Sequence, residues 1–506
     1  MKTKPTLRSA FQPAPFALLF SALFLVTSCS KDDNSDDGNN ATTSIESTTA
    51  VTSGTVEGST ETGANANDNI DNTTSPNTVS IDLGSTTTIT NPLLGNGVTV
   101  SQSGGDVTIN SSATGVNFKL SGNASGSVKI SSLQPVKLTL DNASLTNASG
   151  PAISLESAQG SYIVLTDNSV NTVIDGNSYG TSSSNATISS TGKLVISGNG
   201  SLSVKGNYRH AIASDDYIRI RSGKITITGA AVDGIHANTG IIADGGTIKI
   251  TASNDGFKSA SGRVIVNGGD LTVNSGYEAI SASAAGDRAS AYINLNGGNL
   301  DLKSSAGKGI QAEGALTINK GTVATVSSND ALYAGTSVYI NGGDVYAYST
   351  TADGISSDGS ITISGGRIVA VGAQGMESGI DCGSNALKVT GGVLVGVGGS
   401  TSSPSTSSST VSSVIRGSGS AGQIVHIQSA DGKEALTFEA PVSYSTMLYA
   451  SSKLKNNTTY NMYVGGSVDA GTSFHGLYTG GRYNNGTSAS AFTTTSVVTK
   501  VGGTVN

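Results

Sequence analysis

Carboxylate side chains recur at one position of a sequence repeat, and their type and spacing would let them bind a cation. Each stands two residues before an apolar residue, as in Asp233-Gly234-Ile235 and Asp255-Gly256-Phe257. Lys308 interrupts the series, and on either side of it the acids follow one another at 22 or 23 residues. The set consists of Asp233, Asp255, Glu278, Asp330 and Asp353.

If residues one repeat apart lie above one another, these carboxylates stack about 5 Å apart. At an effective dielectric constant near 20, each neighbouring pair would repel by roughly 3 kcal/mol. Either their pKa values rise or a cation lies between them. Hard oxygen ligands on a rigid edge suit Ca²⁺, which takes six to eight oxygens at about 2.3–2.6 Å, so Ca²⁺ is the expected cofactor. The alternative is that the Asp-Gly pairs only form turns.

A second set of oxygen ligands follows the apolar residue by three or four positions. We expect these side chains to complete the calcium sites together with backbone carbonyls and water. Lys308 would serve as an internal counter-ion between Glu278 and Asp330. The second set consists of Asp215, Asp216, Asn238, Glu313 and Asp358.

No catalytic set of residues emerges from the sequence. The four histidines do not have a metal-protease spacing, and we expect His210 and His236 to be polar surface residues. Trp is absent, so stacking on sugar rings would fall to tyrosines, and we expect Tyr333, Tyr348 and Lys258 to contact a ligand. A polysaccharide lyase would instead use Lys258 or Arg209 as a base beside Ca²⁺.

A repeat of constant length must position these side chains. Glycines precede a short alternating strand at Gly223, Gly246 and Gly269, and the spacing of 22–23 residues persists through Gly366 with one longer interval. Each unit contains three short strands, which predicts one coil of a three-sided parallel β-helix. Ile225 and Ile248 would belong to one inward ladder, and Ile235 and Phe257 to another. A β-sandwich, the alternative, does not need a constant interval.

The rest of the chain divides by composition. Residues 1–28 have a basic start, an apolar run too short to span a membrane, and then Cys29, as in a lipoprotein signal peptide with Cys29 lipidated. Residues 29–76 are polar and are expected to be a disordered tether. The β-helix is expected over 77–398, a low-complexity linker over 399–414, and a small C-terminal β module or cap over 415–506.

Charge restricts the possible partners. The formal net charge is -7. Residues 1–28 carry three basic residues and no acid, so their removal leaves -7 - 3 = -10. A basic face for nucleic acid is therefore not expected. We expect a monomer that touches the membrane only through its lipid, exposed on the outer membrane of the cell envelope because acids follow Cys29.

Several segments resemble one known family. Leu138-Thr139-Leu140-Asp141 with Gly150-Pro151-Ala152-Ile153, the Asp-Gly-Ile coils and Gly480-Gly481-Arg482-Tyr483 are similar to the carbohydrate-binding-domain family of calcium-binding β-helix proteins. The resemblance covers roughly 79–506. It implies a right-handed, pectate-lyase-like parallel β-helix that binds Ca²⁺ through Asp233, Asp255 and Asp353. His210, Ala279 and Lys308 depart from the family pattern.

The resemblance also implies a function. We expect non-catalytic, calcium-dependent binding of polysaccharide at the cell surface, either an acidic glycan such as polygalacturonate or a cellulose-like one. Two alternatives remain open: a calcium-dependent polysaccharide lyase, and a structural adhesin or surface spacer in which the helix is only a rigid rod.

Overall fold

The computed structural model describes residues 42–47, 53–69, 75–180, 184–484 and 486–506. The expected signal peptide and Cys29 lie outside the described residues. Within the described part of the chain, no helix has the length and hydrophobicity of a membrane span. The helical elements in these described ranges are two 3-10 turns, η1 (Ala66–Asp68) and η3 (Arg288–Ser290).

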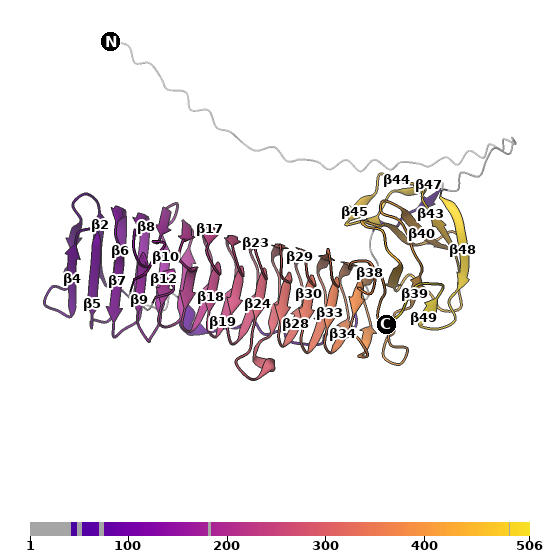
Figure 1. Ribbon diagram of the computed structural model, residues 1–506, viewed down its shortest axis with the longest axis horizontal. Helices are drawn as coiled ribbons and strands as arrows, with labels where there is room; N and C mark the ends of the chain where they lie inside the picture. Colours follow the sequence, from indigo (N-terminus) through magenta and orange to yellow (C-terminus); the bar gives the residue numbers. More distant parts are fainter. Residues whose placement is uncertain (1–41, 48–52, 70–74, 181–183, 485) are drawn as a thin grey trace, which may run out of the picture. The chain divides into compact units, whose positions relative to one another are not determined.

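Parallel strands wind through three faces, so that each strand pairs with the equivalent strand one coil further on (Figure 1). In one coil, β17 (Lys224–Ala230) lies on face A, β18 (Ile235–Ala237) on face B and β19 (Gly240–Ala243) on face C. The next coil repeats them as β20 (Thr247–Ala252), β21 (Phe257–Ser259) and β22 (Arg263–Val266). The predicted all-β parallel β-helix is confirmed.

Face B is a single sheet of 13 strands. Its other strands are β4 (Val98–Ser103), β5 (Asp106–Ser111), β7 (Val128–Ser132), β9 (Ile153–Glu156), β12 (Ala186–Ser190), β15 (His210–Ser214), β24 (Ile280–Ala282), β27 (Ile310–Ala312), β30 (Leu332–Ala334), β33 (Ile355–Ser357) and β36 (Ile380–Asp381).

Faces A and C join into one continuous sheet, because the long strands near the start bend across both. Those long strands are β6 (Val116–Ser125) and β8 (Val136–Thr146). Face A continues with β11 (Val170–Ile174), β14 (Ser201–Gly206), β23 (Asp270–Ser275), β26 (Asn299–Ser304), β29 (Thr322–Ser327), β32 (Asp344–Ser349), β35 (Arg367–Val371) and β38 (Val393–Gly398). Face C continues with β10 (Ser161–Leu165), β13 (Leu194–Gly198), β16 (Tyr217–Ile220), β25 (Ile293–Leu295), β28 (Ala315–Ile318), β31 (Ser337–Ile340), β34 (Ser360–Ile363) and β37 (Leu387–Val389).

The recurrent glycines make the turn from face C to face A. Gly246 and Gly269 have φ angles of 83° and 87°, in the left-handed region that side chains with a Cβ rarely adopt. A Cβ at Gly246 would also lie 2.5 Å from the carbonyl oxygen of Gly223 in the coil before. The repeat of glycine is therefore a requirement of stacking, because each turn approaches the backbone of its neighbour.

Apolar ladders fill the interior. Ile225 pairs with Ile248 on face A, Ile235 with Phe257 on face B, and all four side chains are buried. Strands one coil apart are separated by about 4.8 Å, so each buried side chain packs directly on its equivalent. These are the inward residues that the alternation of the sequence predicts.

The expected disordered tether is wrong for part of its length. Residues 53–69, called the strap from here on, lie along face C and bury the outward side chains of Ile242 and Ile265. An asparagine follows the face C strand in successive coils, and each donates one hydrogen bond to a strap carbonyl. Asn341 donates to Glu57 at 2.7 Å, and Asn319 donates to Ser59 at 2.9 Å.

These asparagines also bond to one another. Asn341 donates to Asn319, Asn319 to Asn296, and Asn296 to Asn267, at 2.8–2.9 Å. The strap thus advances about two residues per coil along a column of amide groups. The prediction of disorder rested on the small apolar area that this composition can bury. In the structure, repeated hydrogen bonds from the asparagines hold the polar strap in place.

Ion pairs fix both ends of the strap. Near its start, Glu57 pairs with Lys388. Near its end, the buried Asp68 accepts from the hydroxyl of Tyr217 at 2.6 Å and pairs with Lys193 at 2.8 Å and Arg219 at 3.3 Å. The strap therefore spans most of the coils of face C.

Antiparallel pairings cover the first coil. β2 (Asn77–Leu83) pairs with β3 (Thr88–Thr90), and β4 pairs with β5 in the same sense. Such pairings keep the first coil from presenting an open strand edge.

The last coil is covered by residues 399–414, which do not extend away as the expected linker. The N–H groups of Ser402 and Ser405 donate to carbonyls of Ile380 and Leu387 in the last coil. Val411 is buried in the same core as the coils. The low-complexity composition gave no sign that this segment covers the last coil. Its small hydroxyl residues let the backbone approach the exposed strands closely.

The C-terminal residues form β39 (Ser413–Arg416) and a separate antiparallel sheet that packs on the last strands of face A. The joining strand, β42 (Thr446–Ser451), pairs antiparallel with β38. The remaining strands are β40 (Ile424–Ser429), β41 (Glu434–Glu439), β43 (Thr459–Val464), β44 (Ser467–Asp469), β45 (Thr472–Phe474), β46 (Leu477–Thr479), β47 (Arg482–Asn484), β48 (Thr487–Thr493), β49 (Val498–Lys500) and, from the start of the chain, β1 (Thr43–Ser44) on β47.

We predict that Asp68→Asn loosens the strap, because Asn cannot keep the charge-assisted contacts to Lys193 and Arg219. Digestion with a protease that cleaves after glutamate should then cut at Glu57 and Glu61 at least severalfold faster than in the unaltered protein. Asp270→Asn, on the exposed side of face A, is the control and should leave the rate unchanged. Equal rates in Asp68→Asn and the control would show that the strap does not depend on this ion pair.

Candidate functional site

The predicted column of acids exists, at the turn from face A to face B. The N–H of Asp255 donates to Oδ1 of Asp233 at 3.1 Å, and the N–H of Glu278 donates to Oδ1 of Asp255 at 3.1 Å. Further along, the N–H of Asp353 donates to Oδ1 of Asp330 at 3.2 Å. All five side chains are buried. Residues one repeat apart are therefore vertical neighbours. Backbone N–H groups of the next coil donate to four of these carboxylates, those of Asp233, Asp255, Asp330 and Asp353.

The charges of the column are compensated unevenly. Burial alone would raise the pKa of Asp233, but the neighbouring His210 and His236 rings hold that pKa well below its usual value. Burial raises the pKa of Asp255, against the opposing charge of Lys258. Burial and the neighbouring charge of Asp255 together raise the pKa of Glu278 to about 8.

Two lysines each form an ion pair with one acid of the column. Lys258 Nζ lies 3.4 Å from Oδ2 of Asp255, and Lys308 Nζ lies 3.3 Å from Oδ2 of Asp330. Burial raises the pKa of Asp353 to about 7, with the hydrogen bond from the Ser378 N–H opposing this effect. Glu278 and Asp353 are thus the acids whose charged forms the structure favours least.

The second set of predicted oxygens lies at the other end of the face B strands. Asp233 and Asn238 are separated by five residues of nearly extended chain, about 16 Å. These side chains therefore form an opposite rim and do not reach the ions that the column would hold. On this rim Thr239 donates to Asp216 at 2.7 Å, the N–H of Ala284 donates to Glu313 at 2.9 Å, and Tyr333 donates to Asp358 at 2.8 Å.

Between the two rims, one outward residue per coil forms a central column on face B. The strand register places Ala213, His236, Lys258, Ser281, Gln311, Tyr333, Ser356 and Asp381 one above another. The structure therefore brings Lys258 and Tyr333 to one surface, three coils or about 14 Å apart. It places Tyr348 on face A, with its ring 6.2 Å from that of Tyr346.

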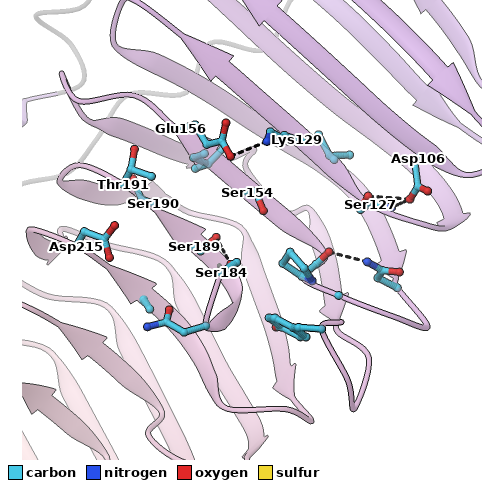
Figure 2. Close-up of a pocket in the computed structure, with 18 of the residues that line it drawn as sticks. Asp106, Ser127, Lys129, Ser154, Glu156, Ser184, Ser189, Ser190, Thr191 and Asp215 are labelled. Atoms are coloured by element: carbon cyan, nitrogen blue, oxygen red, sulfur yellow. Dashed lines mark hydrogen bonds and ion pairs between the residues drawn. The ribbon is translucent and has the colours of Figure 1, made fainter. Parts of the chain in front are cut away.

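A groove of about 540 Å³ opens on the early coils of face B (Figure 2). Lys129 and Glu156 form an ion pair at 2.7 Å on one side of it, and Asp215 lies at the far edge. Most of its lining is serine, asparagine and charged groups, which suits hydroxyl-rich ligands. Sequence reasoning missed this groove because the repeat interval is irregular before Gly200; the signal was the alternation of polar residues in 127–131 and 154–156.

The histidines also differ from the expectation. His210 is buried, and its ring stacks on that of His236 with centroids 4.2 Å apart. Both rings contact Asp233. The sequence shows both residues near the acidic edge, but their contact depends on the register of β15 and β18.

Comparison with known proteins adds the family. Residues 103–354 match the family model described as carbohydrate-binding domain-containing protein. Through this segment, the chain belongs to that family. The carbohydrate-binding domain so defined includes the face B strands from β5 to β30, and with them the groove and all five acids of the column.

A solved structure is also similar to this chain. It is the polysaccharide lyase-like protein from C. thermocellum, in a gadolinium derivative, with 21% identity and a TM-score of 0.37. The alignment covers 53% of this chain and 92% of that one. No curated protein matches the chain.

The raised pKa of Glu278 predicts a pH dependence. Between its ordinary pKa of 4.5 and the value of about 8 in the fold, the folded protein holds a proton that the unfolded chain releases. The free energy of unfolding therefore falls as pH rises through this window. Glu278→Gln removes the penalty and should be more stable than the unaltered protein near pH 9 by roughly 2–5 kcal/mol, the upper figure being the full shift without screening by solvent, and by less than about 1 kcal/mol near pH 5.

Urea unfolding at both pH values, in EDTA to exclude metal ions, measures this difference. Glu313→Gln on the opposite rim is the control, because its carboxylate does not belong to the column. An equal pH dependence in Glu278→Gln and the unaltered protein would show that Glu278 is not the destabilised acid.

Proposed function

We propose that this protein binds polysaccharide on face B without cleaving it. The observation that carries the proposal is that the carbohydrate-binding family segment contains the polar groove and most strands of the face B sheet. The strap lies on face C, and the C-terminal sheet lies on the end of face A. Face B offers a row of small and polar side chains between two rims of oxygen atoms, to which sugar hydroxyls can hydrogen-bond.

Two residues of the central column would contact the glycan. Tyr333 presents a phenol ring, which can pack on the apolar side of a sugar. Lys258 presents an ammonium group three coils away, which can donate to hydroxyl or carboxylate oxygens. A chain lying along the column would reach both, because equivalent positions advance in steps of about 4.8 Å.

We further propose that the binding depends on calcium and favours an acidic glycan such as polygalacturonate, with a cellulose-like glycan as the second choice. Asp255 and Glu278 supply adjacent hard oxygens whose mutual repulsion a Ca²⁺ ion would relieve. On the opposite rim, Asp216, Glu313 and Asp358 carry further carboxylates. Calcium there would bridge rim carboxylates to those of the glycan, which the negative charge of the protein would otherwise repel.

Binding without cleavage is supported by the contacts of Lys258. Its ammonium group donates to the hydroxyls of Ser281 and Ser283, both at 3.0 Å, and lies against Asp255. These contacts engage the group as a charged donor, whereas a lyase base needs a free lone pair.

We predict that polygalacturonate immobilised on beads retains the protein in Ca²⁺ and releases it in EDTA. Lys258→Ala and Tyr333→Ala should each weaken binding by roughly tenfold, about 1.4 kcal/mol. Tyr348→Ala, on face A, is the matched control and should bind normally. No retention on polygalacturonate or cellulose would favour the structural spacer. Absorbance from unsaturated products in the same mixture would favour a lyase.

We also propose that Cys29 is lipidated and holds the protein on the outer membrane at the cell surface. The charged start, the apolar run and the cysteine stand in the order that lipoprotein signals require. Cys29→Ser should move the protein from the membrane fraction to the soluble fraction, as immunoblotting of the two fractions would detect. Retention of this variant in the membrane would rule out the lipid as its anchor.

A further inference from the structure

Two consecutive coils bring two imidazoles and one carboxylate together at the edge of face B. His210 begins β15, Asp233 precedes β18, and His236 lies within β18. Oδ2 of Asp233 is 3.2 Å from Nδ1 of His210 and 2.8 Å from Nδ1 of His236. Among the residues that the structure describes, this is the one group of His, Cys, Asp and Glu in which three potential metal-ligand atoms lie within 4.8 Å of one another.

The hydrogen bonds around His210 leave no hydrogen atom between its Nδ1 and Oδ2 of Asp233. The N–H of Asp233 donates to Nδ1 of His210 at 3.3 Å, so this nitrogen presents its lone pair. The same nitrogen faces Oδ2 of Asp233 at 3.2 Å, which is also an acceptor. If Nδ1 carried a hydrogen to bond the carboxylate, the buried N–H of Asp233 would lose its acceptor. A cation beside Nδ1 and Oδ2 would satisfy both atoms at once.

The neighbouring residues prepare Oδ2 of Asp233 for such an ion. The other oxygen, Oδ1, accepts from the side-chain amide of Asn254 at 2.7 Å and from the N–H of Asp255 at 3.1 Å. These bonds fix the orientation of the carboxylate and leave Oδ2 pointing to the histidines, as outer-shell partners do at metal sites. Lys258 pairs with Asp255 and not with Asp233.

We propose that His210, Asp233 and His236 bind one divalent transition-metal ion of the zinc type. Two imidazole nitrogens and one carboxylate oxygen form a ligand set that suits Zn²⁺ and related ions, whereas Ca²⁺ takes oxygen ligands. Ligands about 2.1 Å from a tetrahedral ion lie roughly 3.4 Å apart, close to the observed separations. The two rings are stacked with their planes inclined by 26°, so binding one ion requires the His236 ring to rotate until its Nδ1 lone pair points at the ion.

The site is built for one open position. His210 and Asp233 are enclosed, whereas the side chain of His236 is 18% exposed and belongs to the central column of face B. A fourth ligand, water or an oxygen of a bound molecule, would therefore approach from face B. This site is independent of the proposed glycan binding, which Lys258 and Tyr333 test separately.

Titration with Co²⁺, a coloured substitute for Zn²⁺, tests the proposal on the purified protein after metal removal with EDTA and dialysis. Visible absorption should saturate at one Co²⁺ per chain, Zn²⁺ should abolish it, and equal Ca²⁺ should not. His236→Gln should weaken Co²⁺ binding at least tenfold while the metal-free melting temperature stays within about 2 °C.

The matched control is His475→Asn, because His475 stacks on Tyr346 of face A, several coils from the site. This variant should bind Co²⁺ normally. Absence of a Co²⁺ spectrum in the unaltered protein, or an unchanged spectrum in His236→Gln, would overturn the proposal and leave a hydrogen-bonded cluster only. Should His236→Gln fail to fold, the same Co²⁺ titration is done on His210→Asn. An unchanged spectrum in that variant would likewise overturn the proposal.

Discussion

Parallel stacking at about 4.8 Å is the constraint on which the rest of the structure depends. It makes every side chain a neighbour of its equivalents one coil before and one coil after. Apolar residues gain from this arrangement, as Ile235 and Phe257 do in the interior. Glycine is required where turns approach backbone, as at Gly246. Residues of like charge repel one another when they are stacked, and in the acid column the protein must compensate for this repulsion.

The column shows three different solutions to one electrostatic problem. Histidines surround Asp233, lysines lie beside Asp255 and Asp330, and backbone N–H groups donate to four of the five carboxylates. Within the described residues Glu278 forms no ion pair, and its raised pKa follows from burial and its acidic neighbour, against the weaker effect of Lys258. A regular backbone therefore carries chemically distinct positions, so that hard-cation and nitrogen-containing sites can lie one or two coils apart.

The three faces have become different surfaces. On face C, the amide column from Asn267 to Asn341 binds the strap, and the covered isoleucines lose their contact with water. On face A, the last strands are continuous with a core shared with the C-terminal sheet. Face B retains the row of polar side chains and the groove, which is why ligand binding is proposed there.

Residue spacing alone determined the coil length, the inward ladders and the vertical alignment of Asp233, Asp255 and Glu278, because a period in sequence becomes a translation in a solenoid. It also indicated the family. Only the tertiary structure decided which positions within one coil share a face and which lie far apart. The asparagines before the glycine turns bind a strap more than 200 residues away in sequence. Tyr348 and Tyr333 lie on different faces, and the rim oxygens lie a strand length from the column. These relations depend on turn geometry and on long-range hydrogen bonds. The asparagines recur with the repeat, but the strap that they bind does not, so their spacing alone does not identify their partner.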